Sequence, residues 1–279
     1  MRKPARVALC SVLALSSVLG LAATAEASPA PVLCYKADQR GDVLVFGSSM
    51  SFHCGSSPNY QPVPKGATAS CAGQQETDDT AGDLYFRDNI ADATILPSQA
   101  RTSATVALPA GARVSYARLY WSALKSGANP NDTNLMTDSS GVYASPDKTA
   151  VIDNLGSPLT VTADLCATSI RYPYPAAYPS WWFYQCSADV TSFFDNWKNG
   201  QFRVTDIEAI ALANVRVHLS YSAWTLVVFY TADADSGADM RNLALFDSFY
   251  FVNPQNSQTG EVISADSVSA TLSGFKVPA

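Results

Sequence analysis

Aromatic side chains gathered in one proline-rich segment are the residues of this chain best suited to binding a ligand. The segment 172–184 reads Tyr-Pro-Tyr-Pro-Ala-Ala-Tyr-Pro-Ser-Trp-Trp-Phe-Tyr. Its three prolines argue against a helix or a regular strand. Flat aromatic faces stack on sugar rings with little loss of conformational freedom. The pattern predicts either a carbohydrate-binding loop or rings that fill one end of the fold, and the candidate ligand-binding residues are Tyr178, Trp181, Trp182 and Tyr184.

Carboxylates recur at short spacing in the segment 233–239, Asp-Ala-Asp-Ser-Gly-Ala-Asp. Asp233, Asp235 and Asp239 stand at positions 1, 3 and 7, a spacing that suits a hard cation with oxygen ligands. The segment departs from the EF-hand pattern because Gly237 takes the fifth position and Ala244 the twelfth, where a bidentate Glu is needed. Calcium at this loop is the only cofactor that the sequence suggests, and a solvated hairpin tip explains the same residues.

The inventory of catalytic groups is small. The chain has two histidines, His53 and His218. It carries no Gly-x-Ser-x-Gly elbow, His-Glu-x-x-His helix or phosphate-binding loop. We therefore name no catalytic residue and expect a protein that is not an enzyme. A secreted hydrolase stays as an alternative, because the carboxylate pair of a glycosidase is brought together in space and leaves no sequence pattern.

The first 27 residues predict an export signal. Arg2, Lys3 and Arg6 form a basic start, residues 7–21 are apolar, and residues 25–27 (Ala-Glu-Ala) offer a cleavage site. The apolar run is too short for a comfortable membrane span, and no later segment approaches one. We expect a secreted or cell-surface chain.

Cysteine spacing in the mature chain fits disulfides better than zinc, since export favours disulfides and no zinc pattern is present. Cys166–Cys186 is the preferred pair, and the loop it closes corresponds to about 3 kcal/mol of chain entropy. Cys54–Cys71 is the second choice. Cys34 would then lie outside both pairs, as a thiol or as a link to another chain.

The charge balance argues against nucleic acid as a partner. Removing residues 1–27 lowers the basic residues from 18 to 15 and the acidic residues from 24 to 23, so the net charge moves from -6 to -8. Nucleic-acid binding needs clustered Lys and Arg. The expected partners are polysaccharide or other components of a cell envelope.

The organisation predicted from the sequence is a single antiparallel β-sandwich, jelly-roll-like, with one short helix. Between Trp224 and Tyr230 both parities are apolar, which indicates a strand covered on both faces. We expect an extended lead at 28–40, one domain at 41–279 and a first strand at 42–47. A domain of this size can bury one sizeable core.

Two local patterns add detail. Alternating residues at 102–108 and 113–124 flank Pro-Ala-Gly-Ala and predict a hairpin. Asp189 has the position of a helix N-cap, and the apolar residues that follow fall at i, i+3, i+4 and i+7, which predicts a short helix. The residues of that stripe are Val190, Phe193, Phe194 and Trp197.

Five motifs in a fixed order resemble an exported bacterial surface domain. They lie at 105–121 (LPAGA…ARLYW), 188–194 (ADVT), 223–230, 241–247 and 273–278. The domain occurs in large secreted and cell-surface proteins of bacteria, myxobacteria among them, some labelled adhesin-like or gliding-motility. The resemblance implies a non-catalytic structural or adhesion module of the envelope or extracellular matrix. Ala223 and Ser248 depart from the motifs, which prefer Gly at both positions.

Overall fold

The strands of this protein form two antiparallel sheets. The computed structural model describes residues 31–52, 85–86, 97–98, 100–126, 146–154, 156–170, 181–195, 199–209 and 222–249. The larger sheet has the order β12-β1-β11-β5-β9-β8, and the smaller sheet has the order β4-β10-β6-β7. A two-residue parallel pair, β2 with β3, stands apart from both. This arrangement confirms the predicted all-β sandwich.

The strands divide between the two sheets as follows. In the larger sheet the strands are β1 (Val32–Ser49), β5 (Arg113–Ser126), β8 (Leu165–Ile170), β9 (Trp181–Asp189), β11 (Ser222–Thr231) and β12 (Met240–Asp247). In the smaller sheet they are β4 (Arg101–Val106), β6 (Thr149–Asp153), β7 (Pro158–Thr162) and β10 (Gly200–Thr205). The short parallel pair consists of β2 (Ser51–Phe52) and β3 (Tyr85–Phe86). By its packing the chain divides into two units, residues 43–232 and residues 1–42 with 233–279.

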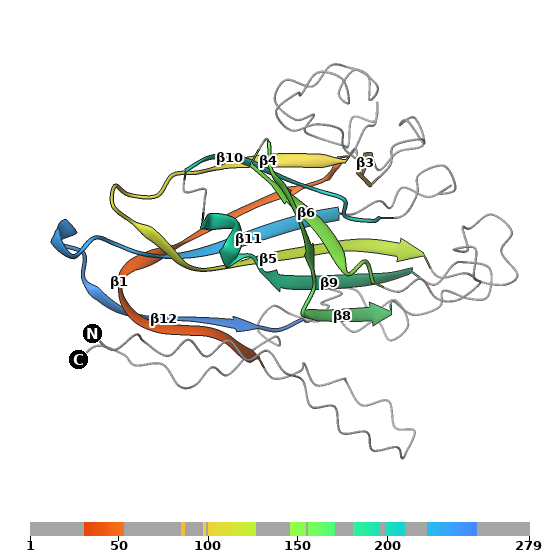
Figure 1. Cartoon of the computed structure of the whole chain (residues 1–279). Coiled ribbons are helices and arrows are strands. Elements are labelled where there is room, and N and C mark those ends of the chain that lie inside the picture. Colours follow the sequence, from red (N-terminus) through yellow and green to blue (C-terminus); the bar gives the residue numbers. More distant parts are fainter. Residues whose placement is uncertain are drawn as a thin grey trace, which may run out of the picture. The chain divides into compact units, whose positions relative to one another are not determined.

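Strand β11 is an inner strand of the larger sheet, as its sequence predicts. It lies between β1 and β5, and its ladder with β5 runs from Ser222↔Ala123 to Thr231↔Arg113 (Figure 1). Trp224, Leu226 and Val228 are buried on the face toward the smaller sheet, and Val227 and Phe229 are buried on the opposite face. Burial of both faces explains why apolar residues occupy both parities.

The core between the two sheets is built on aromatic contacts. The rings of Phe202 on β10 and Trp224 on β11 meet edge to face with centroids 5.4 Å apart. The indole Nε1–H of Trp224 donates to the hydroxyl of Thr102 on β4 at 2.7 Å. Phe46 on β1 packs on the other side of Phe202 at 6.0 Å. One buried ring therefore contacts both sheets, and the polar atom of the buried indole has its partner across the core.

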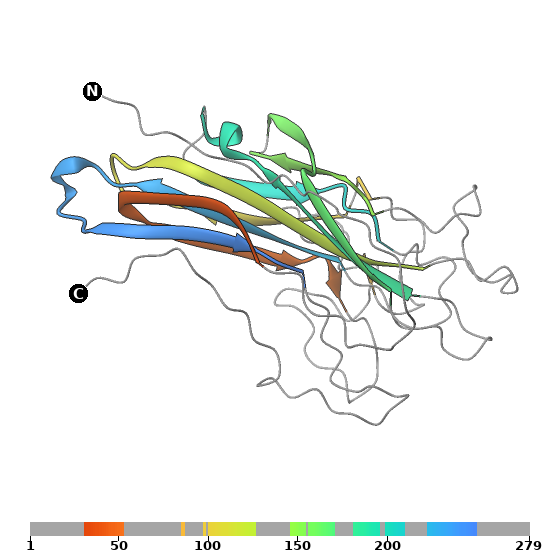
Figure 2. The same ribbon diagram turned by 90° about the horizontal axis from the view of Figure 1, so that it is seen from below.

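The predicted hairpin of residues 102–108 and 113–124 is wrong. Strand β4 pairs with β10 in the smaller sheet, while β5 pairs with β11 and β9 in the larger one (Figure 2). The turn itself exists: Ala112 N donates to Pro109 O at 3.0 Å, and Gly111 has φ 73°, which suits glycine. The turn carries the chain from one sheet to the other, so that the apolar sides of both strands face the same core.

The predicted helix is a single 3-10 turn, Thr191–Phe194. Asp189 ends β9, and its Oδ1 accepts hydrogen bonds from the N–H and the hydroxyl of Thr191 at 2.8 and 2.5 Å. The 3-10 turn buries Phe193 and Phe194. Because β10 begins at Gly200, the chain has little room for a longer helix before it re-enters a sheet. Trp197 lies outside the described residues.

The second unit contains a long two-strand ladder. The first part of β1 pairs with β12 from Val32↔Asp247 to Arg40↔Met240. The guanidinium of Arg241 pairs with the carboxylate of Asp42, and both side chains are substantially exposed. The expected lead at 28–40 is therefore part of a strand from Val32 onward, and the first strand is longer than the predicted 42–47.

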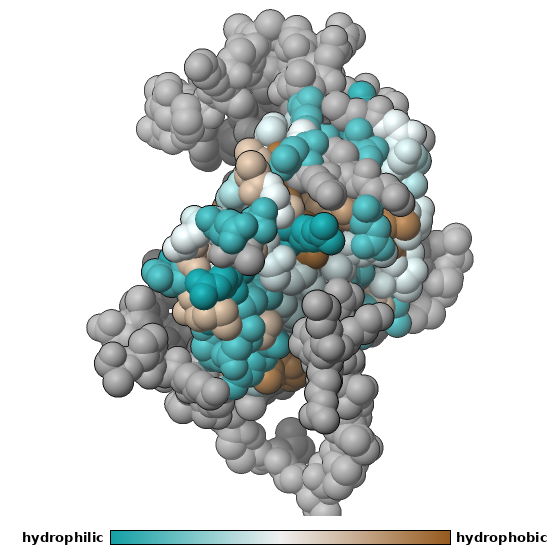
Figure 3. Space-filling model, turned by 60° about the vertical axis from the view of Figure 1, so that its left-hand side comes forward, coloured by the Kyte–Doolittle hydropathy of each residue, from teal (hydrophilic) through white to brown (hydrophobic). Residues whose placement is uncertain are grey.

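Exposed apolar residues are scattered. On the face drawn in Figure 3, hydrophilic and hydrophobic residues are interspersed. The large hydrophobic side chains that are exposed within the described ranges are Leu33, Val45 and Met240. Single exposed residues of this kind are normal for a protein surface. Across the same ranges, no helix has the length and apolar character needed to cross a membrane.

Replacing Phe202 with alanine is expected to lower the free energy of unfolding by about 3 to 5 kcal/mol, since the ring contacts both sheets and its loss leaves a cavity. Urea denaturation measures the change. Thr105→Ala, at an exposed position of the neighbouring strand β4, is the control and changes it by about 0.5 kcal/mol at most. Equal losses in the two variants would contradict this account of the core.

Candidate functional site

The last four residues of the aromatic segment lie in a strand and not in a loop, while residues 172–180 lie outside the described residues. Residues 181–184 are the first part of strand β9, in register with residues 123–126 of β5. Tyr184 is 0% exposed, and its hydroxyl donates to the backbone carbonyl of Glu208 at 2.7 Å. Tyr184 is therefore a core residue, and its selection as a ligand-binding residue is wrong. Strand alternation after Pro179 explains the error, because β9 needs an inward residue at this place.

The other aromatic candidates have different outcomes. Trp181 and Trp182 lie in β9, where Trp182 is in register with Lys125 on one side and with Ile170 on the other. Their role as ligand-binding residues stays a prediction. Tyr178 lies outside the described residues.

The acidic segment forms a tight exposed turn. Ser236 donates to the carbonyl of Asp233 from its N–H at 3.0 Å and from its hydroxyl at 2.5 Å. Gly237 has φ 72°, a conformation that favours glycine. Over the ranges that the structure describes, no three His, Cys, Asp or Glu side chains form a group able to hold a metal. Asp235 lies within the 3-10 turn Ala234–Ser236, with Asp233 before it and Asp239 after it, and their role as calcium ligands stays a prediction.

The preferred disulfide is confirmed. Cys166 on β8 and Cys186 on β9 are bonded, and they face each other directly in the antiparallel ladder with their Cα atoms 4.1 Å apart. Opposed residues of neighbouring strands come this close, which is why adjacent strands can be linked through them. Cys34 is buried. The second predicted pair, Cys54 and Cys71, lies outside the described residues.

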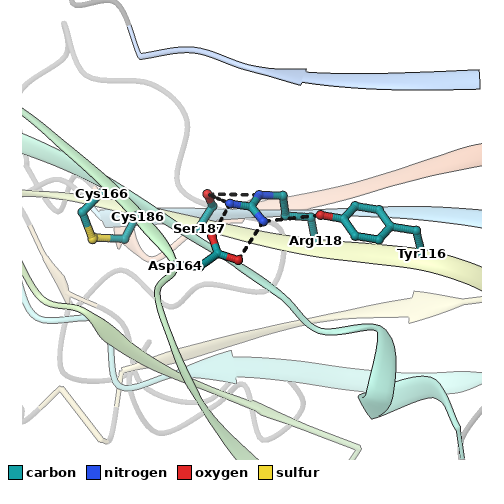
Figure 4. Close-up of polar contacts among 6 residues, drawn as sticks. All are labelled: Tyr116, Arg118, Asp164, Cys166, Cys186 and Ser187. Atoms are coloured by element: carbon teal, nitrogen blue, oxygen red, sulfur yellow. Dashed lines mark hydrogen bonds and ion pairs between the residues drawn. A yellow bond between two sulfur atoms is a disulfide. The ribbon is translucent and has the colours of Figure 1, made fainter. Parts of the chain in front are cut away.

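A buried arginine beside this disulfide is the main polar feature that sequence reasoning missed. Arg118 lies in the middle of β5 and is 1% exposed. Its Nη1 and Nη2 donate to the two carboxylate oxygens of Asp164 at 3.1 and 2.5 Å (Figure 4). Its Nε and Nη2 donate to the hydroxyl of Ser187 on β9 at 3.1 and 2.7 Å. Two-point pairing with a carboxylate uses the planar fork of a guanidinium, a geometry that lysine cannot reproduce.

Two tyrosines complete the surroundings of this guanidinium. Nη1 of Arg118 is 3.4 Å from the hydroxyl of Tyr116, and its charge lies 5.8 Å from the ring centre of Tyr120. Burial by itself lowers the pKa of Arg118, but the hydrogen bonds and charge of Asp164, together with Tyr116, outweigh burial and the net direction is upward. The guanidinium therefore stays charged, and it ties β5 to β9 and to the residue that precedes β8.

The sequence contains only a partial signal for this network. Arg118 follows the outward parity of its strand, where a charged residue is ordinarily solvated. Its partners Asp164 and Ser187 are remote in sequence and come next to it only when β9 pairs with β5. A charged residue flanked by tyrosines at i−2 and i+2 is the feature that could have suggested burial.

A group of carboxylates lies near the end of β10. Asp206 has φ 62°, a conformation uncommon for residues other than glycine and one that Asp and Asn adopt most readily. Burial, and then the negative charges of Asp147 and Glu208, raise the pKa of Asp206. A raised carboxyl pKa is the property that a general acid needs.

The contacts of Asp147 give this group a structural role. Asp147 Oδ1 accepts from the N–H and the hydroxyl of Thr149, each at 3.1 Å, and Oδ2 accepts from the N–H of Glu208 at 2.9 Å. Its backbone carbonyl accepts from the indole of Trp121 at 2.9 Å. Asp147 thus fixes the start of β6, the segment after β10 and a core tryptophan, which accounts for its position without a ligand.

Together these features define a disulfide-bonded antiparallel β-sandwich with a buried ion-pair network. Comparison of the chain with protein-family models, with curated proteins and with solved structures finds no match. The resemblance to an exported bacterial surface domain stays a prediction.

Replacing Asp164 with alanine is expected to lower the free energy of unfolding by about 2 kcal/mol. Loss of one partner of a buried pair leaves the other charge uncompensated, and the effect is reduced here because the Asp164 side chain is 41% exposed. Chemical denaturation measures it. Asp195→Ala, at an exposed residue after the 3-10 turn, is the matched control. A loss in the control as large as that in Asp164→Ala would contradict the special role of the Arg118 pair.

Replacing Asp206 with asparagine is expected to raise the Tm at pH 7 and to have no effect near pH 3. The raised pKa means that the folded state holds the proton more tightly than the unfolded chain does. Stability of the natural chain is therefore lost as pH rises from the unfolded pKa, about 3.9, to the folded pKa. Asparagine tolerates the same φ and does not ionise. A Tm difference that is independent of pH, or a lower Tm at pH 7, would refute this.

Proposed function

We propose that this protein is an exported, non-catalytic structural or adhesion module of a bacterial envelope or extracellular matrix. The observation that carries the proposal is the Cys166–Cys186 disulfide between β8 and β9. Disulfides form and persist in oxidising compartments outside the cytosol. The export signal expected at residues 1–27 agrees with that compartment.

The contacts around the disulfide support a structural role. The disulfide joins β8 to β9, and Arg118 joins β9 to β5 through Ser187. Three neighbouring strands are thus linked by a covalent bond and by a buried charged side chain, in addition to their ladders. A body cross-linked in this way keeps the residues on its surface in fixed positions, which serves a module that must hold a partner outside the cell.

The carbohydrate-binding alternative through the aromatic segment is weakened. Of its four residues, Tyr184 is a buried core residue whose hydroxyl donates to the backbone carbonyl of Glu208. Among the described residues, no contact supports a role for Tyr178, Trp181 or Trp182 in stacking on a sugar ring. The hydrolase alternative would need a catalytic carboxylate pair. The carboxylate of Asp147, near Asp206, instead accepts hydrogen bonds from Thr149 and from the N–H of Glu208, which is a structural role.

Fractionation of a bacterium that produces the chain tests the proposal. We expect the protein in the envelope or matrix fraction, with a mass that lacks residues 1–27 and two hydrogens per disulfide. A protein recovered from the cytosol at full length, with Cys166 and Cys186 reduced, would overturn it.

The double variant Cys166→Ser/Cys186→Ser isolates the contribution of the disulfide. We expect its free energy of unfolding to fall by about 3 kcal/mol, the chain-entropy value for a loop of this size. The natural protein with reductant should show the same loss, and Ser157→Ala, at an exposed position, should show none. No loss on reduction would contradict a stabilising role for the bond.

A further inference from the structure

The outward side of the smaller sheet carries mostly polar residues, and we call it the threonine-rich face. Strand alternation defines it, because Thr102, Val106, Phe202, Val204 and Ile152 point into the core. The residues of the opposite parity make up the face: Arg101, Ser103, Thr105, Thr149, Val151, Asp153, Pro158, Thr160, Thr162, Gln201, Arg203 and Thr205. Hydroxyl and other polar side chains thus occupy most of its positions.

Strand register arranges these residues in rows across the face. Arg101 lies opposite Thr205, Thr205 opposite Val151, and Val151 opposite Thr160, which gives one row over β4, β10, β6 and β7. Neighbouring strands are about 4.8 Å apart. The row therefore presents a guanidinium and two hydroxyl side chains on a pleated surface about 15 Å across.

Hydrogen bonds hold several of these side chains in place. Gln201 Nε2 donates to the hydroxyl of Ser103 at 3.0 Å, and the hydroxyl of Thr205 donates to the carbonyl of Ala100 at 2.9 Å. Arg203 Nε donates to Asp153 Oδ2 at 2.8 Å. Since the side chains are already oriented, a ligand would not need to order them on binding.

The charge of the threonine-rich face is opposite to that of the chain. The face carries two arginines and one aspartate, whereas the whole chain has a net charge of -6. Asp153 is engaged by Arg203 and also accepts from Gly156 N–H at 3.0 Å. Arg101 supplies the second positive charge. The two arginines attract an anion, whereas the carboxylates of Asp206, Asp147 and Glu208 next to the ends of β10 and β6 oppose it.

One N–H group of the Arg101 guanidinium makes no hydrogen bond with the described residues. Its Nε is buried and has no hydrogen-bond partner among the residues that the structure describes. Buried polar groups are nearly always paired, so an exception calls for a specific explanation. A carboxylate at the threonine-rich face would match the charge of the Arg101 guanidinium.

We infer that the threonine-rich face binds a carboxylate-bearing polysaccharide, with Arg101 as the contact for the carboxylate. Sugar hydroxyls both donate and accept, as do the threonine hydroxyls and the Gln201 amide. Guanidinium geometry fits a planar carboxylate. This inference rests on the proposed function, for which it supplies the partner. It places binding on a sheet face and not on the aromatic segment 172–184.

An acidic protein would share the charge of such a polymer but not its hydroxyls. Five threonines and one serine among the twelve outward positions favour a hydroxyl-rich ligand over a peptide. The threonine-rich face also has no aromatic or long aliphatic residue, the kinds of side chain that anchor protein interfaces.

Binding of the purified full-length protein to polygalacturonate, with dextran and poly-glutamate as comparison polymers, tests the inference. We expect binding to polygalacturonate that weakens with salt, and none to the other two. Arg101→Gln should weaken binding about tenfold, the effect of losing one hydrogen bond to a charged group. Thr160→Glu, which puts a carboxylate in the same row, should weaken it by a similar factor.

Arg113→Gln is the matched control, because it removes the same charge from an exposed position at the start of β5 in the other sheet. It should bind as the natural protein does, and the Tm of every variant checks that it is folded. Binding to polygalacturonate that is unchanged in both Arg101→Gln and Thr160→Glu overturns the site. No binding to polygalacturonate, or equal binding to poly-glutamate, overturns the ligand class.

These failures are distinct from a failure of the proposed function. A protein that stays in the envelope fraction but does not bind polygalacturonate keeps its role as an envelope module and loses this partner. A protein found in the cytosol loses the role whatever it binds in solution.

Discussion

The contact of Trp224 with Phe202 and Thr102 is the constraint on which the sandwich depends. It joins the middle of the larger sheet to two strands of the smaller sheet, through ring packing and through one hydrogen bond of a buried indole. A buried indole needs a partner for its N–H, so β4 must lie where Thr102 can accept it. With β4 fixed, β10 and then β6 and β7 follow by pairing, and the threonine-rich face is turned outward.

The far side of the larger sheet is organised by a different interaction. Arg118 is a charge in a buried place, tolerated because Asp164, Ser187 and Tyr116 satisfy its donors. The adjacent disulfide fixes β8 on β9, which keeps Asp164 beside the arginine. The strands β5 and β9 are therefore held by an apolar layer between the sheets and by a polar network on the outer side.

The outcomes of the sequence predictions separate local from non-local information. Strand β11 was predicted because apolar residues on both parities reflect burial on both faces, and Cys166–Cys186 because their spacing and the expected compartment favour a pair. The hairpin of residues 102–124 was wrong, because a tight turn looks the same whether it returns the chain to one sheet or crosses to another. Tyr184 was wrong because the prolines before it hid the start of a strand. Arg101 was overlooked, since a lone arginine in an alternating strand carries no pattern.

The sequence by itself determined the all-β class, the inner position of β11, one disulfide and the acidic charge, because these depend on composition, alternation and spacing along the chain. Tertiary structure decided which strands pair, that Arg118 is buried and paired with Asp164, and which polar residues share a face. Those properties depend on contacts between residues far apart in sequence. Such contacts are selected by the packing of two sheets on one core, and no local pattern records them.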